Sequence, residues 1–196
     1  MKALAFILTL LVSLPAQSRP THRDTVACWI RHVYWDSTHH SARMDMARSL
    51  DYADSIIHWC AEYHLNESRF IALVNWESGF VNNIRDRKLP FNSWSYGLTG
   101  IQLETAKRAL KRLRIERSIT GRDLVLDFDL NVRLGAEQMR FLLDHRCHKH
   151  QRQAEMSYNA GYNGMLKGRG QHYPIDIDWC TKQWIQFQEE HDGSYF

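Results

Sequence analysis

The sequence lacks several features that would assign it to a familiar class at once. Its 196 residues contain no internal repeat and no low-complexity segment. No apolar run reaches the ~20 residues that a membrane-spanning helix needs. The net charge of +3 is too small to indicate a nucleic-acid partner by itself. What remains is 44% hydrophobic, with seven Trp, eight Tyr and eight Phe, which predicts one domain around one substantial core.

Cysteine is scarce and widely spaced. No two cysteines stand at the short spacing of a structural zinc site, and the tract His145–His150, with one thiol and three imidazoles, indicates adventitious metal binding at most. We therefore predict no functional metal site. In an exported protein an even number of cysteines favours two disulfides, with all three pairings open. The four residues are Cys28, Cys60, Cys147 and Cys180.

The first 18 residues are typical of a secretory signal peptide. Lys2 precedes an apolar run from Ala3 to Leu14, and small residues follow Pro15, so cleavage is expected after Ala16 or Ser18. Because the run is short, we favour cleavage over retention as a membrane anchor, and we predict a periplasmic or secreted protein.

Beyond this segment we expect an N-terminal arm at 19–41, attached through Cys28, and a single domain at 42–196. Apolar periodicity and capping residues predict that this domain is mainly α, with at most a small β element between 81 and 100. The expected helices lie at 44–63, 67–78, 103–113, 129–145, 153–160 and 178–191, and the last is expected to bury Trp179, Trp184 and Ile185.

Glu77 occupies an unusual place for a carboxylate. Asn66 is a candidate N-cap and Gly79 a candidate stop signal, so Glu77 falls in the last helical turn, where the helix dipole repels negative charge. Apolar neighbours such as Trp76 and Phe80 also disfavour the charged form, and both effects predict a raised pKa, as a general acid requires. Taken alone, this stretch still favours an ordinary exposed glutamate.

Four stretches in a fixed order change that interpretation. "ESGF", "SYGLTGIQLETAK", "LDFDLNVRLGAEQMRFLLD" and "MSYNAGYNGM" occur in turn between Met44 and Leu166. Together they resemble the catalytic domain of the soluble lytic transglycosylases, a branch of the lysozyme superfamily that cleaves peptidoglycan. The resemblance implies a mainly α, lysozyme-like (α+β) fold with no cofactor.

The resemblance also implies the roles of individual residues. Glu77 matches the single catalytic acid and base, and Gly97, with Ser95 just ahead of it, matches a motif that forms one wall of the glycan cleft. Tyr158 and Asn159 match a motif beside the catalytic glutamate. We therefore expect Ser95, Gly97, Tyr158 and Asn159 to bind substrate.

The chain departs from the family pattern at Gly100, which stands where the family usually has Gln. Gln102 can replace that Gln only if the local backbone is not helical, because two residues turn about 200° around a helix. The linker at 81–96 is also longer than usual, so it either extends the cleft or binds a partner. Asn131 and Gly135 match the helix packed behind the site.

The implied reaction cleaves the MurNAc–GlcNAc β-1,4 bond and forms 1,6-anhydro-MurNAc. One alternative is a hydrolytic muramidase or chitinase-like enzyme that uses Asp86 or a water, although a surface ion pair suits Asp86 better. The other is an inactive secreted glycan-binding protein, which Gly100 keeps open. The expected partner is the peptidoglycan strand, and a short exported form suits a phage product or a secretion or conjugation apparatus. Endo- or exo-cleavage stays open.

Overall fold

The computed structural model describes residues 21–85, 90 and 93–191, so the predicted signal segment 1–18 and Asp86 lie outside the described residues. The first half of the described chain contains α1 (His22–Ser37), α2 (Met46–Glu62), α3 (Glu67–Ser78), β1 (Ile84–Arg85), β2 (Ser95–Tyr96) and β3 (Ile101–Gln102). The second half contains α4 (Leu103–Arg112), α5 (Gly121–Leu126), α6 (Phe128–His145), α7 (Gln151–Ala160), α8 (Tyr162–Leu166) and α9 (Tyr173–His191). The prediction of a mainly α fold with a small β element after Glu77 is confirmed.

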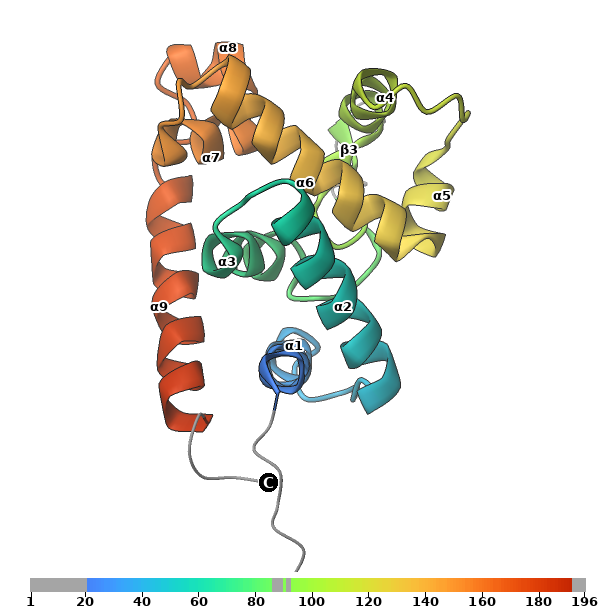
Figure 1. Cartoon of the computed structure of the whole chain (residues 1–196), viewed down its shortest axis with the longest axis vertical. Helices are drawn as coiled ribbons and strands as arrows, with labels where there is room; N and C mark the ends of the chain where they lie inside the picture. Colours follow the sequence, from blue (N-terminus) through green and yellow to red (C-terminus); the bar gives the residue numbers. More distant parts are fainter. Residues whose placement is uncertain (1–20, 86–89, 91–92, 192–196) are drawn as a thin grey trace, which may run out of the picture.

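Helix α3 lies in the middle of the molecule, surrounded by α2, α6 and α9 (Figure 1). Its limits are the predicted ones. The Asn66 side chain accepts a hydrogen bond from the Arg69 amide at 3.1 Å, which satisfies one of the free N–H groups of the first turn. Gly79 ends the helix in the left-handed conformation, with φ of 54°. Glu77 is therefore in the last turn, as predicted.

The segment predicted as an N-terminal arm contains α1. Thr21 and Asp24 form a capping box at its start, and Val26, Ala27 and Ile30 are completely buried. The C-terminal end of α1 reaches the end of α3, since a Cβ atom on Gly79 would lie 2.0 Å from the Ser37 hydroxyl oxygen. This part of the chain therefore packs directly against the helix that carries Glu77.

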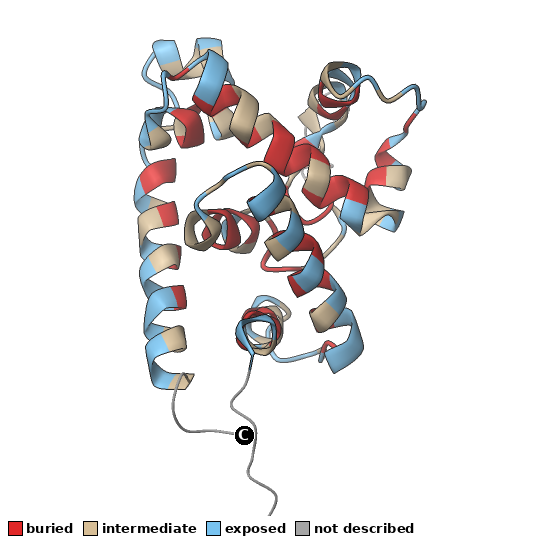
Figure 2. Ribbon diagram, viewed as in Figure 1, coloured by how far each residue is buried: buried red, intermediate tan, exposed pale blue. Residues whose placement is uncertain are grey.

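Helix α6 contributes buried residues to two hydrophobic clusters. Figure 2 shows buried positions along most of its length. Val132, Ala136 and Met139 belong to the larger cluster, which α1, α2, α3 and α9 also form. Leu130 and Leu134 belong to the smaller cluster under the sheet, α4 and α5. The sheet side of the molecule is thus attached to the helical side through α6.

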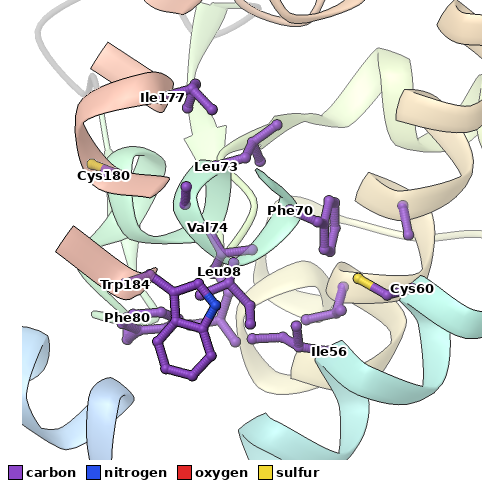
Figure 3. Packing of buried hydrophobic residues seen from close by; sticks show 14 of the residues in the cluster. Ile56, Cys60, Phe70, Leu73, Val74, Phe80, Leu98, Ile177, Cys180 and Trp184 are labelled. Atoms are coloured by element: carbon purple, nitrogen blue, oxygen red, sulfur yellow. The ribbon is translucent and has the colours of Figure 1, made fainter. Parts of the chain in front are cut away.

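Helix α9 corrects the predicted last helix. It begins at Tyr173 and not at Asp178, and its buried residues include Ile177 and Trp184. Figure 3 shows Trp184 directed into the larger cluster together with Leu73 and Val74 of α3. Trp179 and Ile185, which were predicted to be buried, are 59% and 42% exposed. Trp179 is two positions from Ile177, which places it about 200° away around the helix.

The four cysteines correct another prediction, because all of them are free thiols in the structure. Cys60 of α2 and Cys180 of α9 lie at opposite sides of the larger cluster (Figure 3). Cys147 instead shares a hydrogen bond with the Ser157 hydroxyl at 3.5 Å. Burial raises the pKa of the Cys180 thiol to about 11. Cys60 and Cys180 therefore pack as small apolar groups of the larger cluster.

The β element is an antiparallel sheet of the order β1-β2-β3, in which Ile84 pairs with Tyr96, and Ser95 with Gln102. Since α4 follows β3 without a break, the sheet connects the end of α3 to the helix α4 of the smaller cluster. Within the described ranges, no helix combines the length and apolar character needed to cross a membrane.

A largely buried ionic cluster joins three helices. The guanidinium of Arg69 on α3 donates two hydrogen bonds to the Glu155 carboxylate of α7, at 2.6 and 2.7 Å, and one to Asp178 of α9 at 2.8 Å. The Glu155 side chain is only 1% exposed. Its charge is thus compensated by an arginine whose two-pronged geometry matches a carboxylate.

Replacing Arg69 by Ala is expected to lower the free energy of unfolding by about 3 to 5 kcal/mol, because it leaves a buried carboxylate without a cation. Urea denaturation would measure the loss. Arg152→Ala is the matched control, since the Arg152 side chain is 60% exposed and, among the described residues, pairs with Asp178 alone. The control should lose less than about 1 kcal/mol. Equal losses in the two variants would contradict the structural role of Arg69.

Candidate active site

A cleft of about 990 Å³ lies beside the end of α3 and is lined by residues of the sheet, α4, α6, α7 and α8. Of the residues predicted to form the site, Glu77, Ser95, Gln102, Tyr158 and Asn159 line it. Gly97 does not. The structure thus brings together residues from positions 77 to 159, and Glu77 is the only acid among the described lining residues.

The carboxyl group of Glu77 is half-buried and is held by a hydrogen bond from the far end of the chain. The Tyr173 hydroxyl donates to Glu77 Oε1 at 2.5 Å. Tyr173 is the first residue of α9 and is only 3% exposed. One oxygen of the carboxyl group is therefore engaged by the protein, and Oε2 lies on the side of Gly100.

Tyr173 was not predicted as a site residue. Burial raises its pKa well above the usual value, and the negative charge of Glu77 and the hydrogen bond to it act in the same direction. The phenol therefore stays protonated and remains a donor. The available signal was the pair Tyr173-Pro174, because proline is common in the first turn of a helix and marks a start earlier than Asp178.

The backbone at Gly100 lies close to the Glu77 carboxyl group. Its φ is +60°, and a Cβ atom there would lie 2.4 Å from Glu77 Oε2. A side chain at this position would displace the carboxyl group as it is placed here. The departure from the family pattern at Gly100 therefore has a steric reason in this chain.

The backbone at Gln102 is not helical, which is the condition under which Gln102 can replace the family's Gln. Its backbone is extended, with φ of −75° and ψ of 145°, and it ends β3 just before α4. Gly100, in the turn just before β3, and Gln102 both line the cleft. The Gln102 side chain is exposed and does not cap α4, which leaves its amide available to the cleft.

A buried asparagine holds the turn between β2 and β3. Asn131 Oδ1 accepts hydrogen bonds from the amide and the hydroxyl of Thr99, each at 3.0 Å, and its Nδ2 donates to the Tyr96 carbonyl at 2.8 Å. A Cβ on Gly135 would lie 2.6 Å from the Thr99 side chain. Helix α6 therefore packs closely behind the turn, as the resemblance implied.

Gly97 belongs to this support and not to the cleft wall, which corrects its predicted position. It is buried, its φ is +72°, and a Cβ there would lie 2.3 Å from Asn131 Nδ2. Glycine is needed because the turn requires a left-handed residue in contact with the amide of α6.

Tyr158 links the same turn to α7. Its hydroxyl donates to the Thr99 carbonyl at 3.0 Å. Burial and, after it, the charge of Glu77 raise the Tyr158 pKa, so this phenol also stays neutral. Asn159 is an exposed residue in the last turn of α7. Ser95 is half-buried in β2, and both residues line the cleft.

The residues described by the structure contain no group of three or more His, Cys, Asp or Glu side chains that could hold a metal ion. Among the described residues, the site offers the Glu77 carboxyl group, the neutral phenols of Tyr158 and Tyr173 beside it, several arginines, and amide and hydroxyl groups. This set can donate and accept a proton and can form hydrogen bonds with a polar ligand.

A mainly helical domain whose small sheet and long helices enclose one such cleft has the lysozyme-like fold. The chain is similar to the solved structure of an inactive variant of the lytic transglycosylase Slt from Pseudomonas aeruginosa, with a TM-score of 0.55 and 17% sequence identity. The similarity covers 88% of this chain but only 31% of that protein, so the chain spans less than a third of its length.

The family is given by a match in sequence. Residues 54–177 match the model of the transglycosylase SLT domain, which is more than half of the 196 residues. The chain belongs to this family. A comparison with curated proteins finds no match.

The hydrogen bond between Tyr173 and Glu77 can be tested by titration. Tyr173→Phe removes a donor that favours the ionised carboxylate, so the pKa of Glu77 should rise in this variant. NMR of a ¹³C-labelled carboxyl group would measure the change. Tyr158→Phe is the control, because its hydroxyl donates to a backbone carbonyl and not to Glu77. A Glu77 pKa that is unchanged in Tyr173→Phe would contradict this arrangement.

Proposed function

We propose that the chain is a peptidoglycan lytic transglycosylase, which cleaves the β-1,4 bond between MurNAc and GlcNAc and leaves 1,6-anhydro-MurNAc. The observation that carries the proposal is the single carboxyl group of the described cleft lining, Glu77, held against the neutral phenol of Tyr173. A mechanism with one carboxyl group suits this site, whereas hydrolysis with two carboxylates needs a second acid at about 5 to 9 Å.

In the first step Glu77 acts as the general acid. Oε1 already accepts the Tyr173 hydrogen bond, so the proton is carried on Oε2, the oxygen beside Gly100. This proton passes to the glycosidic oxygen as the bond breaks. The N-acetyl group of MurNAc stabilises the positive charge that develops at C1.

In the second step the same carboxylate acts as the base. It removes the proton from the C6 hydroxyl of MurNAc, and that oxygen closes on C1 to form the anhydro ring. Because the nucleophile belongs to the same sugar, the reaction is intramolecular and needs neither water nor a cofactor. The hydroxyl of Tyr173 continues to hold Oε1, so the carboxylate keeps its position between the two steps.

The other predicted site residues are proposed to bind the sugar chain. Gln102 and Asn159 are exposed in the cleft and offer amide groups, and Ser95 offers a hydroxyl. Tyr158 is proposed to position the turn at Thr99 and to exclude water beside Glu77. A cleft of about 990 Å³ is large enough for several sugar rings.

The proposed substrate also bears on location and partners. Peptidoglycan lies outside the cytoplasmic membrane, which supports a periplasmic or secreted protein. Local opening of the wall for a phage, secretion or conjugation apparatus is a role that such an enzyme would suit. No nucleic acid, metal or organic cofactor enters the proposed reaction.

Glu77→Gln is expected to reduce the release of muropeptides at least about 10³-fold, because the amide can neither give nor take the proton. Mass spectrometry of the products is the decisive measurement, since hydrolysis would give products about 18 Da heavier than the anhydro form. Glu116→Gln, a change at an exposed glutamate outside the cleft lining, is the control. Hydrated products would support a muramidase, and no cleavage by the wild type would support a glycan-binding protein.

Gly100→Ala should lower the cleavage rate about 100-fold, because the new methyl group displaces the Glu77 carboxyl group from its position against the substrate, and a displacement of about 1 Å costs roughly that factor. Gly168→Ala is a matched control. Gly168 has a φ of +73° and so carries the same backbone cost, but its Cβ would meet only the end of the Gln171 side chain. Assays of both purified variants, with their melting temperatures, separate the two effects. Equal activities would refute the steric role of Gly100.

A further inference from the structure

The charges of the cleft are unbalanced. Four arginines line it, Arg85, Arg108, Arg112 and Arg146, against the one described acid, Glu77. A groove lined by one sign of charge concentrates ligands of the opposite sign. The sequence is densely basic at 107–117, and the fold places two arginines of this stretch, Arg108 and Arg112, in the cleft lining.

The arginines differ in the partners that the protein supplies. Arg112 donates two hydrogen bonds to the Glu137 carboxylate, at 2.7 and 2.6 Å, so its charge is compensated. Arg108 is exposed, and its one hydrogen bond among the described residues goes to the Thr105 hydroxyl, at 2.9 Å. Arg146 is exposed, and among the described residues no carboxylate lies within 4.0 Å of Arg108 or Arg146.

The guanidinium of Arg146 is held by aromatic rings. Its central carbon lies 5.8 Å from the centre of the Phe141 ring and 5.3 Å from that of Tyr162. Arg112 lies over the same Phe141 ring at 4.1 Å. Stacking engages the face of a guanidinium and leaves the N–H groups at its edge available for a carboxylate. Phe141 and Tyr162 line the cleft as well, so this arginine is oriented within it.

We propose that Arg108 and Arg146 form a subsite for carboxylate groups of the substrate, so that the cleft selects glycan strands that carry carboxylates over neutral ones. The inference rests on the proposed function. Peptidoglycan strands carry carboxylates on the peptides attached to muramic residues, or on the muramic residues themselves where no peptide is attached, whereas chitin has none. Two cations that form no ion pair within 4.0 Å among the described residues therefore give this cleft a preference that Glu77 alone cannot supply.

The test uses the Glu77→Gln chain, which binds strands without cleaving them. Its affinity is measured for fluorescent, soluble peptidoglycan strands and for the same strands after their carboxylates are converted to amides. Amidation should weaken binding about fivefold for each arginine engaged, and the difference should shrink at high salt. The double variant Arg108→Gln, Arg146→Gln should bind the untreated strands more weakly, by the same factor as amidation does in the parent chain. It should bind untreated and amidated strands with the same affinity.

Lys111→Gln is the matched control, because Lys111 is an exposed cation of α4 outside the cleft lining. It should keep the full preference. Equal binding of untreated and amidated strands, or a preference that survives in the double arginine variant, would overturn the subsite. Failure of the subsite can be told apart from failure of the proposed function. If the proposed function is wrong, the wild type cleaves neither untreated nor amidated strands. If only the subsite is wrong, it cleaves both kinds equally.

Discussion

The structure depends on the compensation of one buried charge. The carboxylate of Glu155 has lost almost all contact with water, so the Arg69 guanidinium must face it closely. That requirement brings α7 against α3, and the further bond of Arg69 to Asp178 brings α9 to the same point. The three helices joined in this way carry Glu77 and the two tyrosines beside it, so an ion pair outside the cleft determines how the site is assembled.

Around Glu77 the protein combines a hydrogen bond with a close backbone approach. Tyr173 engages one oxygen, and the missing side chain at Gly100 leaves room for the other. The turn that holds Gly100 is in turn attached to α6 through Asn131. The carboxyl group is thus positioned by Tyr173 of α9 and by the turn at Gly100, which α6 holds in place. This is the preorganisation that proton transfer in both directions would require.

Local signals predicted the helices well where capping residues were present. Asn66 and Gly79 marked both ends of α3, and Gly161 follows the end of α7, because caps act within a few residues of the chain. The same kind of signal misjudged α9, whose burial depends on which face meets α3. The paired cysteines were inferred from number and compartment, and the fold places these thiols in separate surroundings.

By itself the sequence determined the mainly helical class, the position of Glu77 in a last helical turn and, through four ordered motifs, its neighbours in the cleft. Only the tertiary structure decided that Tyr173 bonds to Glu77 from 96 positions away and that Gly97 lies behind the cleft. It also decided that Arg108 and Arg146, which form no ion pair with any described residue, line the cleft. The reason is physical. Caps and periodicity depend on neighbours within one or two turns, whereas these contacts depend on how closely distant elements approach once the core and its buried charges are satisfied.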